Sequence, residues 1–309
     1  MPVVGVQHLG TLKQPVLTVP ATEFNFDGLV GPTHNYAGLS HGNVASTSHQ
    51  HAVSSPKSAA LQGLQKMKFV RDLGIEQCVL PPLPRPDLRL LRSIGFTGSD
   101  PDVIERAYRC DPVLLAVCYS ASNMWTANAA TVSPASDCED QRLHMTPANL
   151  FSNLHRSLEG PATTGILRSI FAESSLFQIH DPLPASSALA DEGAANHTRL
   201  GPYWDSAGLE LFVFGARFLD SNSPRPARFP ARQTLEASEA IARRHRLDPD
   251  RCLFIQQHPE AIDAGVFHND VICVGHQNVI LCHRRAFLDQ HETKAQLQEK
   301  YRQLFDAEL

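Results

Sequence analysis

Helix-like and strand-like segments alternate along most of this chain, and that alternation limits it to mixed α/β folds. Short, largely apolar segments that indicate strands occupy residues 78–80, 209–214 and 252–255. Two more, at 270–274 and 279–282, are separated by a Gly-His-Gln-Asn sequence, which is typical of a hairpin turn. Because strands return through hairpins, a purely parallel, doubly wound sheet fits the sequence poorly.

Helices are indicated by start signals, end signals and apolar spacing. Ser55-Pro56 predicts a helix start, and Gly74 predicts its end. The segment between them carries an apolar stripe made of Leu61, Leu64, Met67, Val70 and Leu73. Asp100-Pro101 predicts a second helix start, and residues 234–245 and 297–305 also have helical character.

Length and composition favour one globular domain. A chain of 309 residues suggests one large domain or two ordinary ones, and no repeat or low-complexity linker divides it. Gly5, Gly10, Pro15 and Pro20 interrupt the beginning of the chain. We therefore expect residues 1–22 to form a loose extension and residues 23–309 to form a single domain.

Charge and cysteine usage exclude several classes of protein. The net charge of −5 argues against nucleic-acid binding, which needs a basic face. No apolar run is long enough to span a membrane, and the N-terminus lacks the features of a signal peptide. The seven cysteines contain no C-x-x-C pair, which favours free thiols in a reducing cytoplasm.

Two short turns rich in small residues carry groups suited to chemistry. Residues 191–197 (DEGAANH) offer the carboxylate of Glu192, and residues 265–270 (GVFHND) offer His268 and Asp270. Such a set could grip a planar cation and move protons around it, so we expect these three side chains to line one cavity. The alternatives are a helix N-terminus at Glu192 and a core-edge histidine at 268.

Other polar residues are candidates for ligand binding. Residues 25–43 are dense in Gly, Asn, Ser and His, which is typical either of a ligand-binding loop or of an ordinary surface loop. His155-Arg156 and Arg232 could bind carboxylates, although surface ion pairing is the plainer interpretation for a single arginine. Asn128 could bind a substrate through its amide or simply occupy a turn.

A metal site near the end of the chain is one alternative that the sequence offers. Cys273, His276, Cys282 and His283 are possible ligands by type. However, both cysteines lie within apolar runs and the spacing matches no standard zinc pattern, so we expect no metal.

Six motifs together resemble the N-succinylarginine dihydrolase family. They are NFDGLVGPTHNYAGLSHGN, SASNMWTANAAT, NLHRSLE, DEGAANH, FPARQT and GVFHNDV, in that order along the chain. The resemblance runs from about Glu23 to the last residue. It implies the pentein fold of the amidinotransferase superfamily, which is a fan of ββαβ modules (an α/β propeller) around a central pocket.

The resemblance also implies residue roles. Positions 192 and 268 match catalytic residues of the family. Substrate-binding positions of the family match Ala37, Gly38, Leu39, Ser40, His41, Gly42, Asn43, Val44, Ala45, Ser46, Asn128, His155, Arg156, Arg232 and Asp270. In the implied reaction, Glu192 and Asp270 hold the guanidinium of N2-succinyl-L-arginine, and Arg156 and Arg232 hold its carboxylates.

The implied activity is release of N2-succinyl-L-ornithine, two ammonia and carbon dioxide by a cytoplasmic homodimer that needs no cofactor. Family members continue beyond position 309, and their nucleophilic cysteine lies in that later part. We therefore expect a fold that is incomplete at its C-terminus and no dihydrolase activity from this chain alone. The alternatives are a non-catalytic pentein that binds only a ligand or a partner and, less favoured, a metal-dependent hydrolase.

Overall fold

The computed structural model describes residues 21–35, 38–40 and 43–309. Its strands are β1 (Phe24–Gly28), β2 (Glu76–Leu80), β3 (Ala130–Ser133), β4 (Leu143–Pro147), β5 (Phe177–Ile179), β6 (His197–Leu200), β7 (Leu209–Phe214), β8 (Cys252–Gln256), β9 (Cys273–His276) and β10 (Val279–Cys282). Its α-helices are α1 (Val44–Thr47), α2 (Pro56–Asp72), α3 (Leu88–Ser93), α4 (Asp100–Cys110), α5 (Pro112–Cys118), α6 (Leu154–Ser157), α7 (Gly160–Ile170), α8 (Leu235–Arg244), α9 (Pro259–Asp263) and α10 (Gln290–Phe305).

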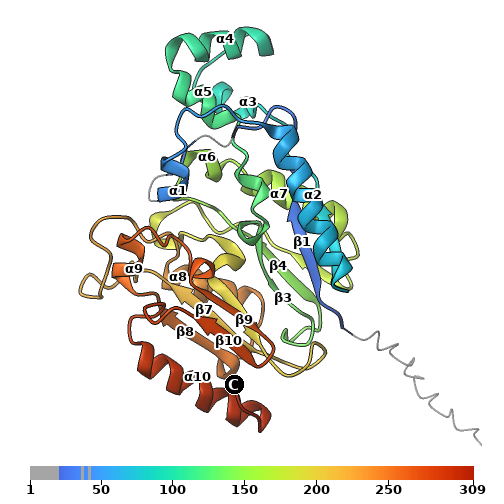
Figure 1. Cartoon of the computed structure of the whole chain (residues 1–309), viewed down its shortest axis with the longest axis vertical. Helices are drawn as coiled ribbons and strands as arrows, with labels where there is room; N and C mark the ends of the chain where they lie inside the picture. Colours follow the sequence, from blue (N-terminus) through green and yellow to red (C-terminus); the bar gives the residue numbers. More distant parts are fainter. Residues whose placement is uncertain (1–20, 36–37, 41–42) are drawn as a thin grey trace, which may run out of the picture.

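Two units of the chain share one ββαβ topology. In the first, β3 pairs antiparallel with β4, and β4 pairs parallel with β5 after helix α7. In the second, β6 pairs antiparallel with β7, and β7 pairs parallel with β8 after helix α8. These modules confirm the expected mixed α/β fold of pentein type, and they lie side by side in Figure 1.

Two smaller sheets flank the modules. Strands β1 and β2 form a parallel pair joined by α2, and β9 and β10 form an antiparallel hairpin that precedes α10. Figure 1 shows α2 beside β1, α10 at the opposite end of the molecule, and α3, α4 and α5 projecting beyond the sheets. The capping box that Ser99 and Asp102 form explains why α4 begins where it does.

Strand β7 is the centre of the largest core. All six of its residues are buried, and its side chains alternate between two faces. Leu211 packs in one hydrophobic cluster with Leu297 and Tyr301 of α10, whereas Phe212 packs in another with Ile241 of α8. A strand covered on both faces is expected to be largely apolar, and Glu210 is the one charged residue within Leu209–Phe214.

The predicted elements are largely confirmed, with one shift that matters for the site. The hairpin forms, but its first strand begins at Cys273 rather than at residue 270. Residues Asn269–Val271 instead form a short 3-10 helix, and the backbone N–H of Asn269 donates to the Asn196 side chain at 3.0 Å. Asp270 therefore lies in a turn, where its side chain can face a cavity.

The apolar stripe of α2 does not form a core. Met67 is the buried residue of the helix, whereas Leu61, Leu64 and Leu73 are exposed. The helical prediction was right because spacing identifies a helix, but spacing alone does not say that the apolar face is covered. The expected loose extension at residues 1–22 falls mostly on residues 1–20, which lie outside the described part of the chain.

Candidate active site

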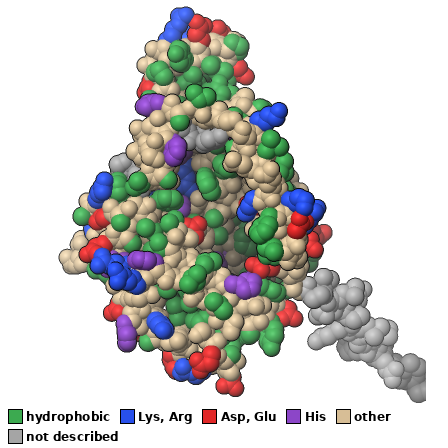
Figure 2. Space-filling model, viewed as in Figure 1, with side chains coloured by type: hydrophobic (Ala, Val, Ile, Leu, Met, Phe, Trp, Pro, Cys, Tyr) green, Lys and Arg blue, Asp and Glu red, His purple; other side chains and the backbone are tan. Residues whose placement is uncertain are grey.

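A cavity of about 790 Å³ is formed by segments that are far apart in the sequence. Its walls come from the loop around α1, the stretch before β3, helix α6, the turn before α8 and the 3-10 helix before β9. Figure 2 shows the hollowed middle of the face on which these segments meet.

Most of the residues predicted for the site line this cavity. They are Leu39, Ser40, Asn43, Ala45, Ser46, Asn128, His155, Arg156, Arg232, His268 and Asp270. Gly38 and Val44 are not among the lining residues, and the Val44 side chain is exposed. Ala37, His41 and Gly42 lie outside the described residues. The six motifs are thus brought together by the fold, although they span most of the sequence.

The loop that precedes and includes α1 is tied to the cavity by polar contacts. Asn43 caps α1, since its side-chain oxygen accepts from the Ser46 N–H at 3.0 Å. The Ser40 hydroxyl lies 3.2 Å from Nε2 of His155, which joins the loop to α6. Gly38 has φ +59°, and an added Cβ would lie 2.3 Å from Gln50, so only glycine fits there.

Glu192 lies at the base of the site and has no exposed surface. Its Oε2 atom accepts from Nε2 of His268 at 2.8 Å and also pairs with Nη1 of Arg156. Its backbone is fixed as well, because its N–H donates to Gln233 and its carbonyl accepts from Nδ2 of Asn128 at 2.7 Å. This network holds the imidazole and the carboxylate in one defined geometry.

This placement corrects one expectation. Glu192 was expected to line the cavity and hold the guanidinium together with Asp270. The carboxylate instead lies behind Arg156 and His268, so Asp270 is the acidic side chain among the lining residues. Arg156, expected at the carboxylate end of a ligand, lines the cavity and also pairs with Glu192. The sequence could not show which of Glu192 and Asp270 lines the cavity, because both acids lie in similar turns of small residues.

The electrostatics of the site follow from burial and the two arginines. Burial alone would raise the pKa of Glu192, but Arg156 and then His268 outweigh it and lower that pKa to about 2. Burial lowers the pKa of His268, and Glu192 opposes this shift. Burial, followed by the charges of Arg156 and Arg232, lowers the pKa of His155 to about 3. At neutral pH the site therefore holds an ionised Glu192 beside neutral imidazoles.

His268 has the geometry of a general acid–base group. Because Glu192 is ionised, Nε2 of His268 carries the hydrogen of their 2.8 Å bond. Its other nitrogen, Nδ1, is then the atom that can accept or return a proton. Asp270 is two residues away and also lines the cavity, and burial raises its pKa. This pair can bind a cationic group and exchange protons with it.

No cysteine is among the described residues that line the cavity. Burial raises the pKa of Cys118 to about 11 and the pKa values of Cys138, Cys252 and Cys273 to about 12, so these thiols are protonated and poor nucleophiles. Among residues 21–35, 38–40 and 43–309, no group of three or more His, Cys, Asp or Glu side chains could hold a metal ion.

Several lining residues were not predicted, although some adjoin the motifs. Phe267 precedes His268, and its ring lies 4.9 Å from the Arg232 guanidinium carbon. Ser122 and Trp125 lie within the SASNMWTANAAT motif, and both line the cavity. Their position in the same motif as Asn128 was the feature of the sequence that could have identified them.

None of the helices in the described part of the chain is both long enough and apolar enough to cross a bilayer.

Comparison with known structures gives the fold independently of close sequence similarity. The N-terminal domain of ArgZ bound to product, an arginine dihydrolase from the ornithine–ammonia cycle in cyanobacteria, superposes with a TM-score of 0.52 at 15% identity. The match covers 90% of this chain and 72% of that one. Unliganded AgrE superposes with a TM-score of 0.51 at 16% identity, over 89% of this chain and 29% of that one.

Sequence comparison gives the family. N-succinylarginine dihydrolase of Shewanella loihica is 57% identical over 280 residues, which cover 90% of this chain and 63% of that protein. The enzyme of the same name from Pseudoalteromonas translucida is 54% identical over 283 residues, which cover 92% of this chain and 63% of that protein. This chain thus spans about 63% of the length of these relatives. The family model described as succinylarginine dihydrolase matches residues 20–308, and the chain belongs to this family.

Proposed function

We propose that this protein binds N2-succinyl-L-arginine in the central cavity and takes part in its hydrolysis to N2-succinyl-L-ornithine, two ammonia and carbon dioxide. The main support is the cluster in which Glu192 orients His268 beside Asp270 at the cavity wall. The names of relatives that are 54% and 57% identical also support this substrate. They favour a hydrolase over a protein that only binds a ligand.

The guanidinium would be held by the acidic side of the cavity. It is planar and remains protonated at working pH, so it needs a carboxylate that can accept its N–H groups. Asp270 is the acidic group among the described residues that line the cavity, and Glu192 bonds to His268, two residues before it. Arg232, which is buried against Phe267, is the candidate for binding a ligand carboxylate at the other end.

The proposed reaction proceeds by addition to the guanidinium carbon. A thiol gives its proton to Nδ1 of His268 and attacks this carbon as the thiolate, and ammonia then leaves with that proton, which forms an amidino-thioether. Water then adds to the thioether carbon, His268 takes its proton, and the thiol leaves. A second cycle on the ureido product uses another water and releases ammonia, carbon dioxide and the ornithine derivative. The family resemblance assigns the thiolate to a cysteine without a counterpart among the seven cysteines of this chain.

The oligomeric state and location form part of the same proposal. We infer a homodimer in the cytoplasm, as the family resemblance implies. Sedimentation equilibrium of the purified chain tests the first point, because a dimer has twice the 34.0 kDa mass of the chain.

The proposed activity is tested by incubating the purified protein with N2-succinyl-L-arginine. Ammonia is measured with a glutamate dehydrogenase couple, and N2-succinyl-L-ornithine is measured by mass spectrometry. Formation of both products by the wild type, and of neither by His268→Ala, supports the hydrolase and contradicts the expectation that this chain alone has no dihydrolase activity. Calorimetric binding without either product supports ligand binding alone, and absence of binding contradicts the assigned substrate.

A further inference from the structure

Trp125 presents an uncharged aromatic surface at the cavity. Its side chain is 65% exposed, yet the residue lines the cavity that holds His268 and Asp270. A tryptophan can bury a large apolar area, so leaving one exposed forgoes considerable hydrophobic stabilisation. Single exposed aromatic residues occur on many surfaces. What distinguishes Trp125 is that its backbone is held firmly on both sides.

The segment that carries Trp125 is fixed by a buried ion pair. The Ser122 hydroxyl donates to Oε1 of Glu159 at 2.5 Å, and Arg85 approaches the same oxygen at 3.4 Å. Nε of Arg85 also donates to the Ser120 carbonyl at 2.7 Å. Both charged side chains are nearly fully buried. The buried Arg85–Glu159 pair thus holds this stretch of the wall in place, and burial raises the pKa of Glu159 to about 7.

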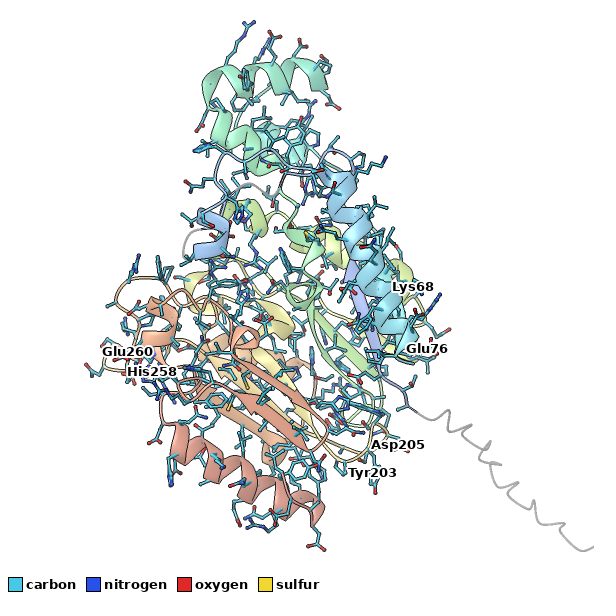
Figure 3. All side chains as sticks on the ribbon, in the orientation of Figure 1. Lys68, Glu76, Tyr203, Asp205, His258 and Glu260 are labelled. Atoms are coloured by element: carbon cyan, nitrogen blue, oxygen red, sulfur yellow. The ribbon has the colours of Figure 1, made fainter. Side chains whose placement is uncertain are left out.

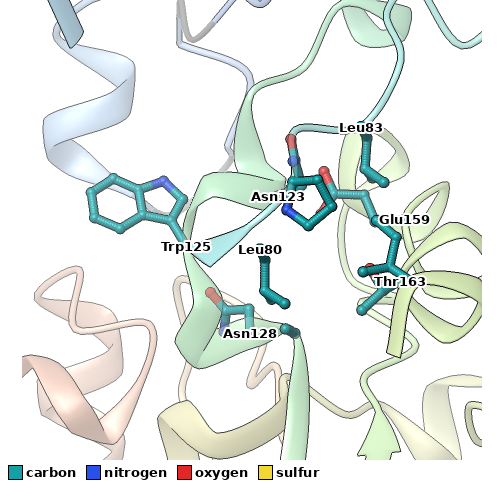
Figure 4. Close-up of a pocket in the computed structure, with 10 residues that line it drawn as sticks. Leu80, Leu83, Asn123, Trp125, Asn128, Glu159 and Thr163 are labelled. Carbon is teal, nitrogen blue, oxygen red and sulfur yellow. The ribbon is translucent and has the colours of Figure 1, made fainter. Parts of the chain in front are cut away.

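The backbone that follows Trp125 is also fixed. The Thr126 hydroxyl donates to the Phe26 carbonyl at 2.6 Å, and the Asn128 N–H donates to the Trp125 carbonyl at 3.0 Å. In Figure 4 the indole points away from Leu80, Asn123 and Glu159, although Trp125 also lines the smaller pocket that these residues form. The segment thus presents the indole in one direction, and Asn128 at its end contacts the backbone of Glu192.

The cavity lining offers both polar and apolar side chains. Arg156, Arg232, His268 and Asp270 supply charged or titratable groups, whereas Trp125, Leu39, Ala52, Val53, Ala121 and Met124 supply apolar surface. A ligand with two charged ends joined by methylene groups would match both kinds of lining. The proposed substrate has this form, because three methylene groups separate its guanidinium from its α-carbon.

We propose that Trp125 is a specificity-determining residue that packs over the three-carbon chain of the bound arginine derivative. This inference rests on the proposed function, since it assumes that ligand. Covering three methylene groups with an indole removes them from water, so the loss of Trp125 should weaken binding by roughly tenfold or more. A phenylalanine at this position would retain part of the apolar surface and part of the affinity.

The chain offers a direct reporter of this contact, because it contains two tryptophans. Trp204 does not line the cavity, and its ring packs on His276 at 5.5 Å. Its neighbours Tyr203 and Asp205 lie at the edge of the molecule in Figure 3. The variant Trp204→Phe therefore has Trp125 as its single tryptophan, and its emission reports on the cavity wall.

The experiment titrates Trp204→Phe with N2-succinyl-L-arginine and records the emission maximum, with calorimetric binding measured in parallel. We expect a blue shift that saturates at the calorimetric Kd. N2-succinyl-L-ornithine, which keeps the methylene chain, should produce the same shift at saturation. N-succinylglycine, which has no side chain, should produce none. Trp125→Ala should weaken binding by roughly tenfold, and Trp125→Phe should recover part of this loss.

The parallel calorimetry separates failure of the Trp125 assignment from failure of the proposed function. Binding with unchanged emission, or equal affinities of wild type and Trp125→Ala, overturns the role of Trp125 and leaves the proposed function standing. Absence of calorimetric binding by the wild type contradicts the proposed function itself. A shift with N-succinylglycine at saturation also overturns the assignment, because that ligand has no chain to cover.

Discussion

Glu192 determines the charge balance of the site. Its side chain has no exposed surface, and a carboxylate in that position would ordinarily be protonated. Arg156 and His268 hold its pKa near 2, so the buried charge depends on those two partners. Removing Arg156 leaves an uncompensated charge in the interior, which is far more costly than removing one partner of a surface ion pair.

Arg156→Ala should therefore destabilise the folded protein. We expect a loss of about 3–5 kcal/mol in the free energy of unfolding at neutral pH, measured by urea denaturation. Arg168→Ala is the matched control, because Arg168 pairs with Asp181 at 3.0 Å on the surface. That change should cost less than about 1 kcal/mol. Equal losses in the two variants would contradict the buried charge network.

The pKa of His268 should report on Glu192. Burial lowers this pKa, and the Glu192 carboxylate raises it again in part. Glu192→Gln should therefore lower the pKa of His268 below its value in the wild type, as measured by NMR titration of the imidazole protons. Glu210→Gln, which alters a carboxylate outside this cluster, should leave it unchanged. A higher pKa of His268 in Glu192→Gln would show that the two side chains do not interact as described.

At the scale of elements, the two ββαβ modules are joined by a second buried charge network. Arg199 of β6 donates to Asp137, in the loop between β3 and β4, at 2.6 Å and 3.0 Å. Next to it, His197 of β6 bonds to Glu210 of β7 at 2.5 Å. Burial raises the pKa of Glu210 to about 7, whereas the hydrogen bonds and charge of Arg199 outweigh burial and lower the pKa of Asp137. The junction between the modules should therefore respond to pH.

Glu210→Gln should change the pH dependence of stability. The pKa of Glu210 rises from 4.5 to about 7 on folding, so the folded state binds more protons in this window, and stability falls as pH rises through it. Between about pH 5 and about pH 8, the variant should lose about 1–3 kcal/mol less stability than the wild type. The control Glu239→Gln, on the exposed face of α8, should follow the wild type. Parallel curves for Glu210→Gln and the wild type would contradict this role.

The elements differ in how far the sequence could predict them. The strand expected at residues 209–214 matches β7 residue for residue, because a strand covered on both faces is apolar at most positions, here at all but Glu210. The shared ββαβ topology of the two modules left no sequence repeat, since it is set by strand pairing and not by residue identity. The 3-10 helix at Asn269–Val271 was not foreseen because a tertiary contact to Asn196 holds it.

At the scale of the whole molecule, the cavity exists only because distant segments converge. The motifs identified most of its lining residues, including His268, Asp270 and Arg232. The sequence could not show that Glu192 lies behind His268, because depth in a structure depends on packing between segments. The sequence placed Trp125 in the same motif as Asn128, but it could not show that the buried Arg85–Glu159 pair fixes the segment that carries Trp125.

We propose that residues 23–309 unfold as one unit, since the cavity joins segments from both ends of this range. Urea unfolding followed by far-UV circular dichroism and by tryptophan emission should give coincident transitions. Trp125 and Trp204 report on different regions, so the emission samples both the cavity and the β6–β7 loop. Transitions with separate midpoints would indicate more than one domain.

The most direct test of the central claim is calorimetric titration of this chain and of Asp270→Asn with N2-succinyl-L-arginine. If Asp270 holds the guanidinium beside His268, the substitution should weaken binding by roughly 10- to 100-fold. The surface variant Glu260→Gln, at a position labelled in Figure 3, should bind like the wild type. Unchanged affinity in Asp270→Asn would contradict the account.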